Sequence, residues 1–298
     1  DDKITYDAKV LPQQFNNPVH GIRMTNDGKI VLSDRGNNRI QVFEKDGKFI
    51  REYPLLRDTT APGVTGSTVF WTDKNQSYWF TSDDPNGEIH IFRKSDGVRV
   101  AAFSLNTLMA QGSFGNLCDT DNFGDPVVLY DSFEDRWIIT DFAFTRTGSN
   151  INNPPGSFQC FAVSKSGDPV SGGWNFFSVN TTGGLGDYPK FGIWPTATNS
   201  AYLATYNLFA NAATFVGGMA CAFDRAKMLA GQPAQSICYT ISGDGGYLPV
   251  DMDGPTPPLD GAPGLFVNYE TFSSLRGLLA TARARHDELA AQAVKDAA

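Results

Sequence analysis

The stretch VHGIRMTNDGKIVLSDRGNNRIQVFEKDGKFIREY, residues 19–53, decides the fold of this chain. Three turn signals divide it, at Asn26-Asp27-Gly28, at residues 34–38 (DRGNN) and at Asp46-Gly47. The segments between the turns are short, and residues 39–43 (RIQVF) alternate as a half-buried strand does. The stretch therefore predicts four short strands in one antiparallel meander.

A second copy of this unit follows. Residues 88–92 (EIHIF) match residues 39–43, and Asp96-Gly97 lies 50 residues after Asp46-Gly47. A four-stranded repeat with a period of about 40–50 residues is typical of a propeller blade. Because one blade cannot bury both of its faces, blades must stack on neighbours around an axis.

The second half of the chain repeats more loosely, with four-strand sets over residues 127–179 and 190–241 and a fifth that begins near Tyr247. We predict an all-β chain: a β-propeller over residues 1–272, with five or six four-stranded antiparallel blades. Either an N-terminal strand completes the last blade and closes the ring, or the ring is incomplete. Residues 273–298 are Ala-rich with leucines at helical spacing, which predicts a C-terminal α-helix. This helix either docks a partner or caps the open end of the ring.

Charge and hydropathy exclude two classes of partner. The net charge of −8 argues against nucleic acid, whose binders carry a basic face. No run of about 18 apolar residues is present, so we expect no membrane span. The chain begins at Asp1-Asp2-Lys3, which is compatible with the start of a processed mature protein.

The four cysteines allow two interpretations. Cys221 and Cys238 flank a predicted turn and are placed to pair across adjacent strands, which leaves Cys118 and Cys160 as a second pair. Four buried free thiols are the alternative.

The opening stretch resembles the NHL repeat family of β-propellers. The resemblance lies in HGIR (residues 20–23), DRGNNR (34–39) and DGKF (46–49), and it weakens over residues 68–103. HGIR is most similar to the start of a blade in peptidyl-α-hydroxyglycine lyases. This likeness implies a metal on the ring axis, held by histidines from several blades.

Residues 116–270 are similar to a different group, uncharacterised secreted bacterial proteins. The segments that carry this likeness include GDPVVLYDSFEDRW (124–137), DYPKFGIWP (187–195) and ACAFDRAKMLAG (220–231). The resemblance implies a propeller-like fold and an extracellular or cell-surface location. No activity is attached to that group.

The lyase hypothesis is limited by its histidines. A catalytic zinc needs about three protein ligands and one open position. The chain has three histidines, and of these only His20 stands at the position that opens a blade; His90 is mid-strand and His286 lies in the predicted helix. A metal-dependent lyase or hydrolase near His20 is therefore the alternative function, and enzyme activity is not the first expectation.

Carboxylates suggest a calcium loop. Residues 119–125 (DTDNFGD) space oxygen ligands at alternate positions around a glycine, as calcium loops do. The predicted metal ligands are Asp119, Asp121, Asp125 and Asp253, with calcium as the cofactor. The other interpretation is turn chemistry, because Asp, Asn and Gly form tight turns without an ion.

The function that the sequence favours is a secreted binding scaffold for a protein or glycan partner, without chemistry of its own. This expectation rests on fold resemblance rather than on a convergent catalytic set. The tryptophans either stack on sugars or fill the space between blades. The predicted binding residues lie at blade openings and turns: His20, Arg23, Asp187, Tyr188 and Lys190.

Overall fold

The computed structural model describes residues 9, 14–16, 19–56, 63–66, 68–83, 86–147, 150–152, 156–181, 184–210, 213–252 and 254–268. The predicted C-terminal helix over residues 273–298 and the metal candidate Asp253 lie outside these residues. The described part is built almost entirely of antiparallel strands, which form four four-stranded sheets and two short two-stranded ones.

The first two sheets are the two copies of the predicted meander. Blade 1 consists of β1 (Gly21–Met24), β2 (Ile30–Asp34), β3 (Arg39–Phe43) and β4 (Phe49–Pro54). Blade 2 consists of β5 (Thr68–Phe70), β6 (Tyr78–Asp83), β7 (Glu88–Arg93) and β8 (Arg99–Ser104). Gly47 and Gly97 occupy equivalent turns with φ of 88° and 72°, a left-handed conformation that glycine adopts without steric cost.

The next two sheets are larger. Blade 3 consists of β9 (Val127–Asp131), β10 (Arg136–Ala143), β13 (Ser157–Ser164) and β14 (Trp174–Thr181). Blade 4 consists of β15 (Leu185–Trp194), β16 (Ala201–Ala210), β17 (Thr214–Asp224) and β18 (Ser236–Ser242). A small hairpin, β11 (Thr145–Thr147) with β12 (Asn150–Asn152), lies between β10 and β13 in the chain.

Helical structure in the described residues is short. A five-residue helix α1 (Leu105–Met109) links blades 2 and 3, and α2 (Arg225–Leu229) connects β17 to β18. No helix in this part of the chain is long and apolar enough to cross a membrane.

The described residues form four complete blades, fewer than the five or six predicted. After β18 the described residues, which end at 268, form only β19 (Leu248–Pro249) and β20 (Phe266–Val267), a two-stranded sheet that lies against β15 and β16. The segment between these strands is rich in proline and glycine, and proline cannot donate a hydrogen bond to a ladder. A fifth four-stranded sheet therefore does not form over residues 243–268.

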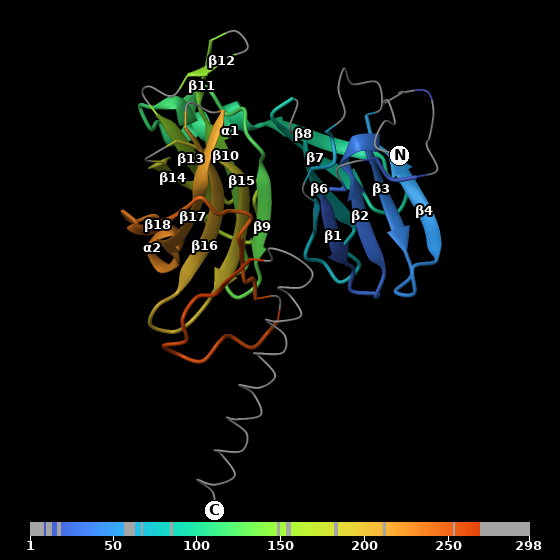
Figure 1. The fold of residues 1–298 in the computed structure, drawn as a ribbon. Helices are drawn as coiled ribbons and strands as arrows, with labels where there is room; N and C mark the ends of the chain where they lie inside the picture. Colours follow the sequence, from blue (N-terminus) through green and yellow to red (C-terminus); the bar gives the residue numbers. More distant parts are fainter. Residues whose placement is uncertain are drawn as a thin grey trace, which may run out of the picture.

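The hydrophobic core is divided into layers between consecutive blades. One cluster joins blades 1 and 2 through Tyr53 and Trp79, one joins blades 2 and 3 around Trp137, and one joins blades 3 and 4 around Phe161 and Tyr202. Figure 1 shows the blue-to-cyan blades 1 and 2 beside the green-to-orange blades 3 and 4. The inner strands contact one another in the order β1, β5, β9, β15 and β19, which defines the axis.

The cysteines form two disulfides, as the pairing hypothesis predicted, and the alternative of four free thiols is wrong. Cys221 and Cys238 stand opposite each other on β17 and β18. Cys118 and Cys160 connect the segment before blade 3 to β13, with Cα atoms 5.7 Å apart.

Candidate functional site

The four inner strands begin at the same end of the axis, which we call the leading end, and they enclose a cavity there. Its volume is about 190 Å³. It receives residues from all four blades, including His20 and Arg23 of blade 1, Gly66 of blade 2, Asp125 before β9 and Lys190 of β15. The tertiary structure therefore brings together three of the five predicted binding residues and one predicted metal ligand.

His20 is fixed at the wall of this cavity by two backbone contacts. Its N–H donates to the carbonyl of Ser33 at 2.9 Å, and its Nδ1 lies 2.8 Å from the carbonyl oxygen of Gly66 in the next blade. Because a carbonyl only accepts, Nδ1 carries the proton and the neutral ring keeps a lone pair on Nε2. Burial lowers the pKa of His20 below its usual 6.5, although the hydrogen bond to Gly66 acts in the opposite direction. His20 is therefore neutral at pH 7.

Blade 4 presents its side chains to the axis through a β-bulge. The register of β15 with β16 shifts between Asp187 and Lys190, and bulges redirect side chains in this way. Tyr188, within the bulge, has φ of 54°, a left-handed conformation that is uncommon for a non-glycine residue. The Asp187 carboxylate accepts the N–H of Tyr188 at 2.7 Å, and the Lys190 ammonium lies 3.5 Å from the centre of the Tyr188 ring. The three predicted binding residues of blade 4 thus form one unit.

The charges at the leading end influence one another. Burial raises the pKa of Asp187, the negative charge of Asp125 raises it further, and Lys190 and Arg35 act against this. Lys190 and Arg35 also disfavour a positive charge on His20, and Asp125 favours it. Two acids, two cations and a neutral imidazole therefore share one electrostatic environment. Arg35 was not predicted, although its place directly after Asp34 in a turn at this end of blade 1 was a usable signal.

Arg23 occupies the axis beneath this cluster. It lines the cavity at the leading end and also a second cavity of about 440 Å³, which includes Tyr130 and Asp251. In the described part of the chain, the Arg23 side chain has no hydrogen-bond or ion-pair partner. A guanidinium is always charged and carries five donors, so Arg23 offers unsatisfied donors to a ligand on the axis.

The predicted calcium ligands do not converge. The Asp119 carboxylate accepts the N–H groups of Phe114 and Gly115 at 2.9 and 2.8 Å, which is turn chemistry. Asp121 accepts the hydroxyl of Thr120 at 2.6 Å, whereas Asp125 faces the axial cavity. Within the described ranges, the group of three His, Cys, Asp or Glu side chains close enough to share an ion is formed by other residues, Asp83, Glu88 and His90. Calcium at residues 119–125 stays a prediction.

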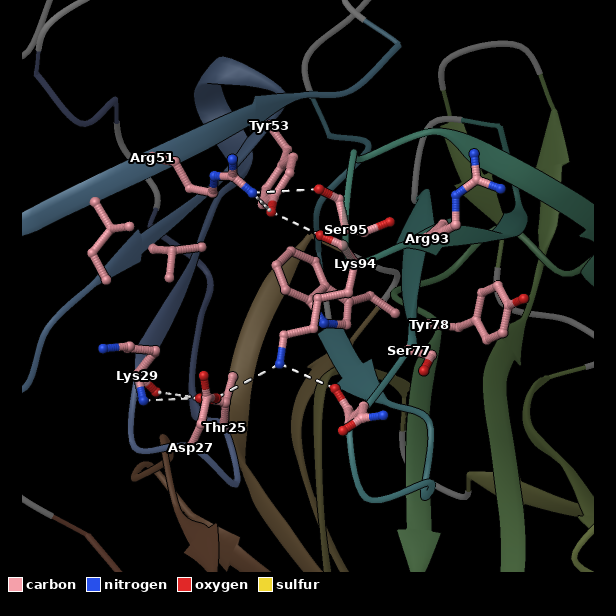
Figure 2. A pocket seen from close by; sticks show the side chains of 14 residues that line it. Thr25, Asp27, Lys29, Arg51, Tyr53, Ser77, Tyr78, Arg93, Lys94 and Ser95 are labelled. Atoms are coloured by element: carbon pink, nitrogen blue, oxygen red, sulfur yellow. Dashed lines mark hydrogen bonds and ion pairs between the residues drawn. The ribbon is translucent and has the colours of Figure 1, made fainter.

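A larger cavity, of about 770 Å³, lies between the outer parts of blades 1 and 2 (Figure 2). Its lining includes four cations, but three of them have carboxylate partners: Lys29 with Glu44, Arg93 with Asp96, and Lys94 with Asp27. The fourth, Arg51, donates to the Tyr53 hydroxyl at 2.9 Å. Because these pairs neutralise most of the charge, the cavity at the leading end is the stronger candidate.

Comparison with known proteins supports the repeat. The NHL repeat matches residues 15–43, which cover most of blade 1. No curated protein matches the sequence.

Several solved structures are similar in outline. A periplasmic gluconolactonase from Pseudomonas aeruginosa is 11% identical, with a TM-score of 0.46 over 90% of this chain and 62% of that one. A candidate 6-phosphogluconolactonase from Bacteroides fragilis is 17% identical, with a TM-score of 0.43 over 86% and 60%. A virginiamycin B lyase from Staphylococcus aureus is 15% identical, with a TM-score of 0.36 over 74% and 69%.

This chain spans 60% and 62% of the length of the two lactonase-type structures. Its own strand order, four consecutive four-stranded antiparallel sheets around one axis, is that of propeller blades. The chain therefore has the four-stranded blades of a β-propeller, and the NHL repeat matches its first blade.

Proposed function

We propose that this propeller is a binding protein that takes the acidic end of a glycan at the leading end of its axis. The observation that carries the proposal is Arg23, a guanidinium on the axis without a partner among the described residues. Guanidinium groups bind carboxylates through two parallel hydrogen bonds, which makes Arg the residue best suited to an acidic sugar.

The surroundings of Arg23 fit the same ligand. Lys190 and Arg35 add positive charge, and the neutral His20 and the Asp125 carboxylate can accept hydrogen bonds from sugar hydroxyls. Tyr188 is 42% exposed on the bulge beside Lys190 and offers a ring face for stacking. A volume of 190 Å³ holds about six waters at roughly 30 Å³ each. It has room for one terminal sugar rather than a chain.

Binding measurements with matched oligosaccharides test the proposal. The chain is titrated with a uronic-acid-terminated oligosaccharide and with its neutral counterpart, at two salt concentrations. We expect the acidic form to bind at least about tenfold more tightly, and Arg23→Gln to remove that preference, because the variant loses the charge and the paired donors.

Arg51→Gln is the matched control, since Arg51 lies in the cavity between blades 1 and 2, away from the axis. It should leave binding unchanged. Equal binding of the acidic and neutral sugars, or an unchanged preference in Arg23→Gln, contradicts the proposal. Binding to an acidic peptide, without binding to either oligosaccharide, would indicate that the ligand is a protein and not a glycan.

The second candidate is a metal-dependent lyase or hydrolase centred on His20. The observation that favours it is the Nδ1 hydrogen bond to the Gly66 carbonyl, the arrangement by which metal-binding histidines are oriented. Asp125 is the acid whose negative charge acts on the His20 ring. Turnover of a peptidyl-α-hydroxyglycine substrate with added zinc, lost in His20→Ala, would support it; no turnover would eliminate it.

We further propose that the protein works outside the cytosol. The two disulfides support this, because such bonds persist in oxidising compartments. Fractionation of the native host, with an antibody against the chain, tests the location. Recovery in the cytosolic fraction with all four thiols reduced would contradict it.

A further inference from the structure

Blade 1 holds a buried cation between two carboxylates. Arg39, with a side chain only 1% exposed, donates from Nε to Asp34 at 2.7 Å and from Nη1 to Glu52 at 2.8 Å. Asn37 also donates to Asp34, from Nδ2 at 2.8 Å. This Asp-Asn-Arg arrangement closes the turn between β2 and β3.

Blade 2 keeps the carboxylate of this arrangement and loses its cation. Asp83 and Asn86 stand where blade 1 has Asp34 and Asn37, and Asn86 again donates to the aspartate at 2.8 Å. The other positions differ in three ways. Glu88 replaces Arg39, His90 replaces Gln41 and Ala102 replaces Glu52. An acid and an imidazole thus occupy the place of the guanidinium.

These side chains converge on one face of the sheet. Glu88 and His90 are two residues apart on β7, and Asp83 pairs with Glu88 across from β6. His90 Nε2 lies 2.8 Å from Asp83 Oδ2 and 3.6 Å from Glu88 Oε2, and all three ligand atoms lie within 4.8 Å of one another. The Asp83 and His90 side chains are 0% and 1% exposed, whereas that of Glu88 is 37% exposed.

We propose that Asp83, Glu88 and His90 bind one zinc ion, which supplies in blade 2 the positive charge that Arg39 supplies in blade 1. With bonds of about 2.0–2.2 Å, neighbouring ligands of a tetrahedral zinc lie about 3.3 Å apart. The observed spacings of 2.8 and 3.6 Å lie on either side of that value. One nitrogen and two carboxylate oxygens suit zinc, whereas calcium takes oxygen ligands.

The fourth position of the site opens toward solvent. The partial exposure of Glu88 leaves that side of the cluster accessible, so a water completes the tetrahedron. Asn86 holds Asp83 through both its backbone N–H, at 3.2 Å, and its side-chain amide. The Asp83 carboxylate is thus oriented before the ion binds.

One proton must move when zinc binds. Without the ion, His90 donates from Nε2 to Asp83, because the Arg99 guanidinium, 3.5 Å from Nδ1, can only donate and needs the Nδ1 lone pair as its acceptor. Zinc takes the Nε2 lone pair, so the ring proton transfers to Nδ1 through solvent. Arg99 lies on the exposed edge strand β8 and is free to turn away. The ring therefore holds one proton before and after zinc binds.

The test is zinc titration of the full chain, purified without a histidine tag. We expect one zinc per chain, and cobalt(II) bound at the same site should show the visible absorption of a tetrahedral complex. His90→Gln installs the residue of blade 1 and should weaken zinc binding by at least about 100-fold, the upper end of the loss of an outer-shell partner. Glu88→Arg restores the Asp-Arg pair of blade 1 and should abolish binding while the chain stays folded.

His286→Gln is the matched control, because it removes a histidine outside the cluster, and it should bind zinc as the unaltered chain does. His20→Gln is the discriminating variant, because the second candidate function places an ion at His20. No zinc binding by the unaltered chain, or undiminished binding in folded His90→Gln, overturns the proposal. Loss of zinc in His20→Gln alone would place the ion on the axis, where it bears on the second candidate function instead.

Discussion

Arg225 and Asp131 form a buried bidentate ion pair that joins blade 4 to blade 3. Arg225 Nε lies 2.6 Å from Asp131 Oδ2, and Nη2 lies 2.9 Å from Oδ1. The Tyr202 hydroxyl adds a third hydrogen bond to the same carboxylate at 2.9 Å. These contacts assign Asp131 a structural role.

Removing the cation from this pair should destabilise the chain. In Arg225→Met, the Asp131 carboxylate keeps the hydrogen bonds from the Tyr202 hydroxyl and the Phe133 N–H, but it loses its counter-ion while its side chain is 0% exposed. We expect a loss of about 3–5 kcal/mol in the free energy of unfolding, the usual cost of a buried charge without its partner. Urea denaturation followed by circular dichroism measures it. Arg93→Met, which breaks an exposed pair with Asp96, is the control and should show no measurable change.

His20 should make stability depend on pH. Its pKa is lower in the folded chain than in the unfolded chain, so the unfolded chain takes up a proton first as the pH falls. The neutral His20 ring therefore contributes fully to the stability of the folded chain above pH 6.5, its pKa in the unfolded chain. This contribution is lost as the pH falls from 6.5 toward the lower pKa of the folded chain. We expect the melting temperature to drop over this range, and to drop less in His20→Gln.

NMR titration of the His20 ring measures its pKa in the folded chain directly. A midpoint at or above 6.5 for His20 in the folded chain would contradict the assignment. His90→Gln serves as the control, because it leaves the axis unchanged.

The ionised Asp187 side chain should lower the stability of the folded chain at neutral pH. Burial raises the pKa of its carboxyl, so ionisation of the folded chain is disfavoured relative to the unfolded chain. Asp187→Asn keeps an oxygen that accepts the Tyr188 N–H and removes the charge. The variant should melt at a higher temperature at pH 7, and the gain should vanish as the pH falls below the usual carboxyl pKa of 3.8. A variant that melts at a lower temperature at pH 7 would show that the charge stabilises the site.

The two disulfides should differ in their access to reductant. Cys118 and Cys160 are fully buried, whereas Cys238 lies exposed on the edge strand β18. Dithiothreitol under native conditions should therefore open Cys221–Cys238 first, and mass spectrometry after alkylation identifies the labelled residues. Earlier labelling of Cys118 would contradict the burial. The double variant Cys221→Ala/Cys238→Ala should lose about 3 kcal/mol of stability, the amount expected for a loop of this length.

Sequence signals predicted the blades well because each blade forms from contacts between residues that are close in sequence. The Asp-Gly turns, the alternation of residues 39–43 and the 50-residue repeat all reflect contacts between strands that are neighbours in sequence. The same signals failed after β18, where the predicted strand content gave way to proline and glycine. They also missed the β15 bulge, since a strand was expected to begin only at Lys190 but begins at Leu185.

The sequence named several residues of the candidate site but not their arrangement, and their role in binding stays a prediction. His20, Arg23 and Lys190 were chosen because they open blades, and the structure brings them to one cavity. Asp119 and Asp121 were chosen for their spacing, and the structure uses them in turns. The zinc candidate was missed because no sequence pattern relates Asp83 on β6 to His90 on β7.

The amino-acid sequence by itself determined the blade: four strands, their turns and the need to stack, all from period-two burial and turn residues within about 35 positions. Only the tertiary structure decided which side chains share the axis. His20 and Lys190 lie 170 positions apart, and they line one cavity because each begins, or bulges from, the inner strand of its blade. The position of a blade around the ring is set by packing between whole sheets, and no local pattern records it.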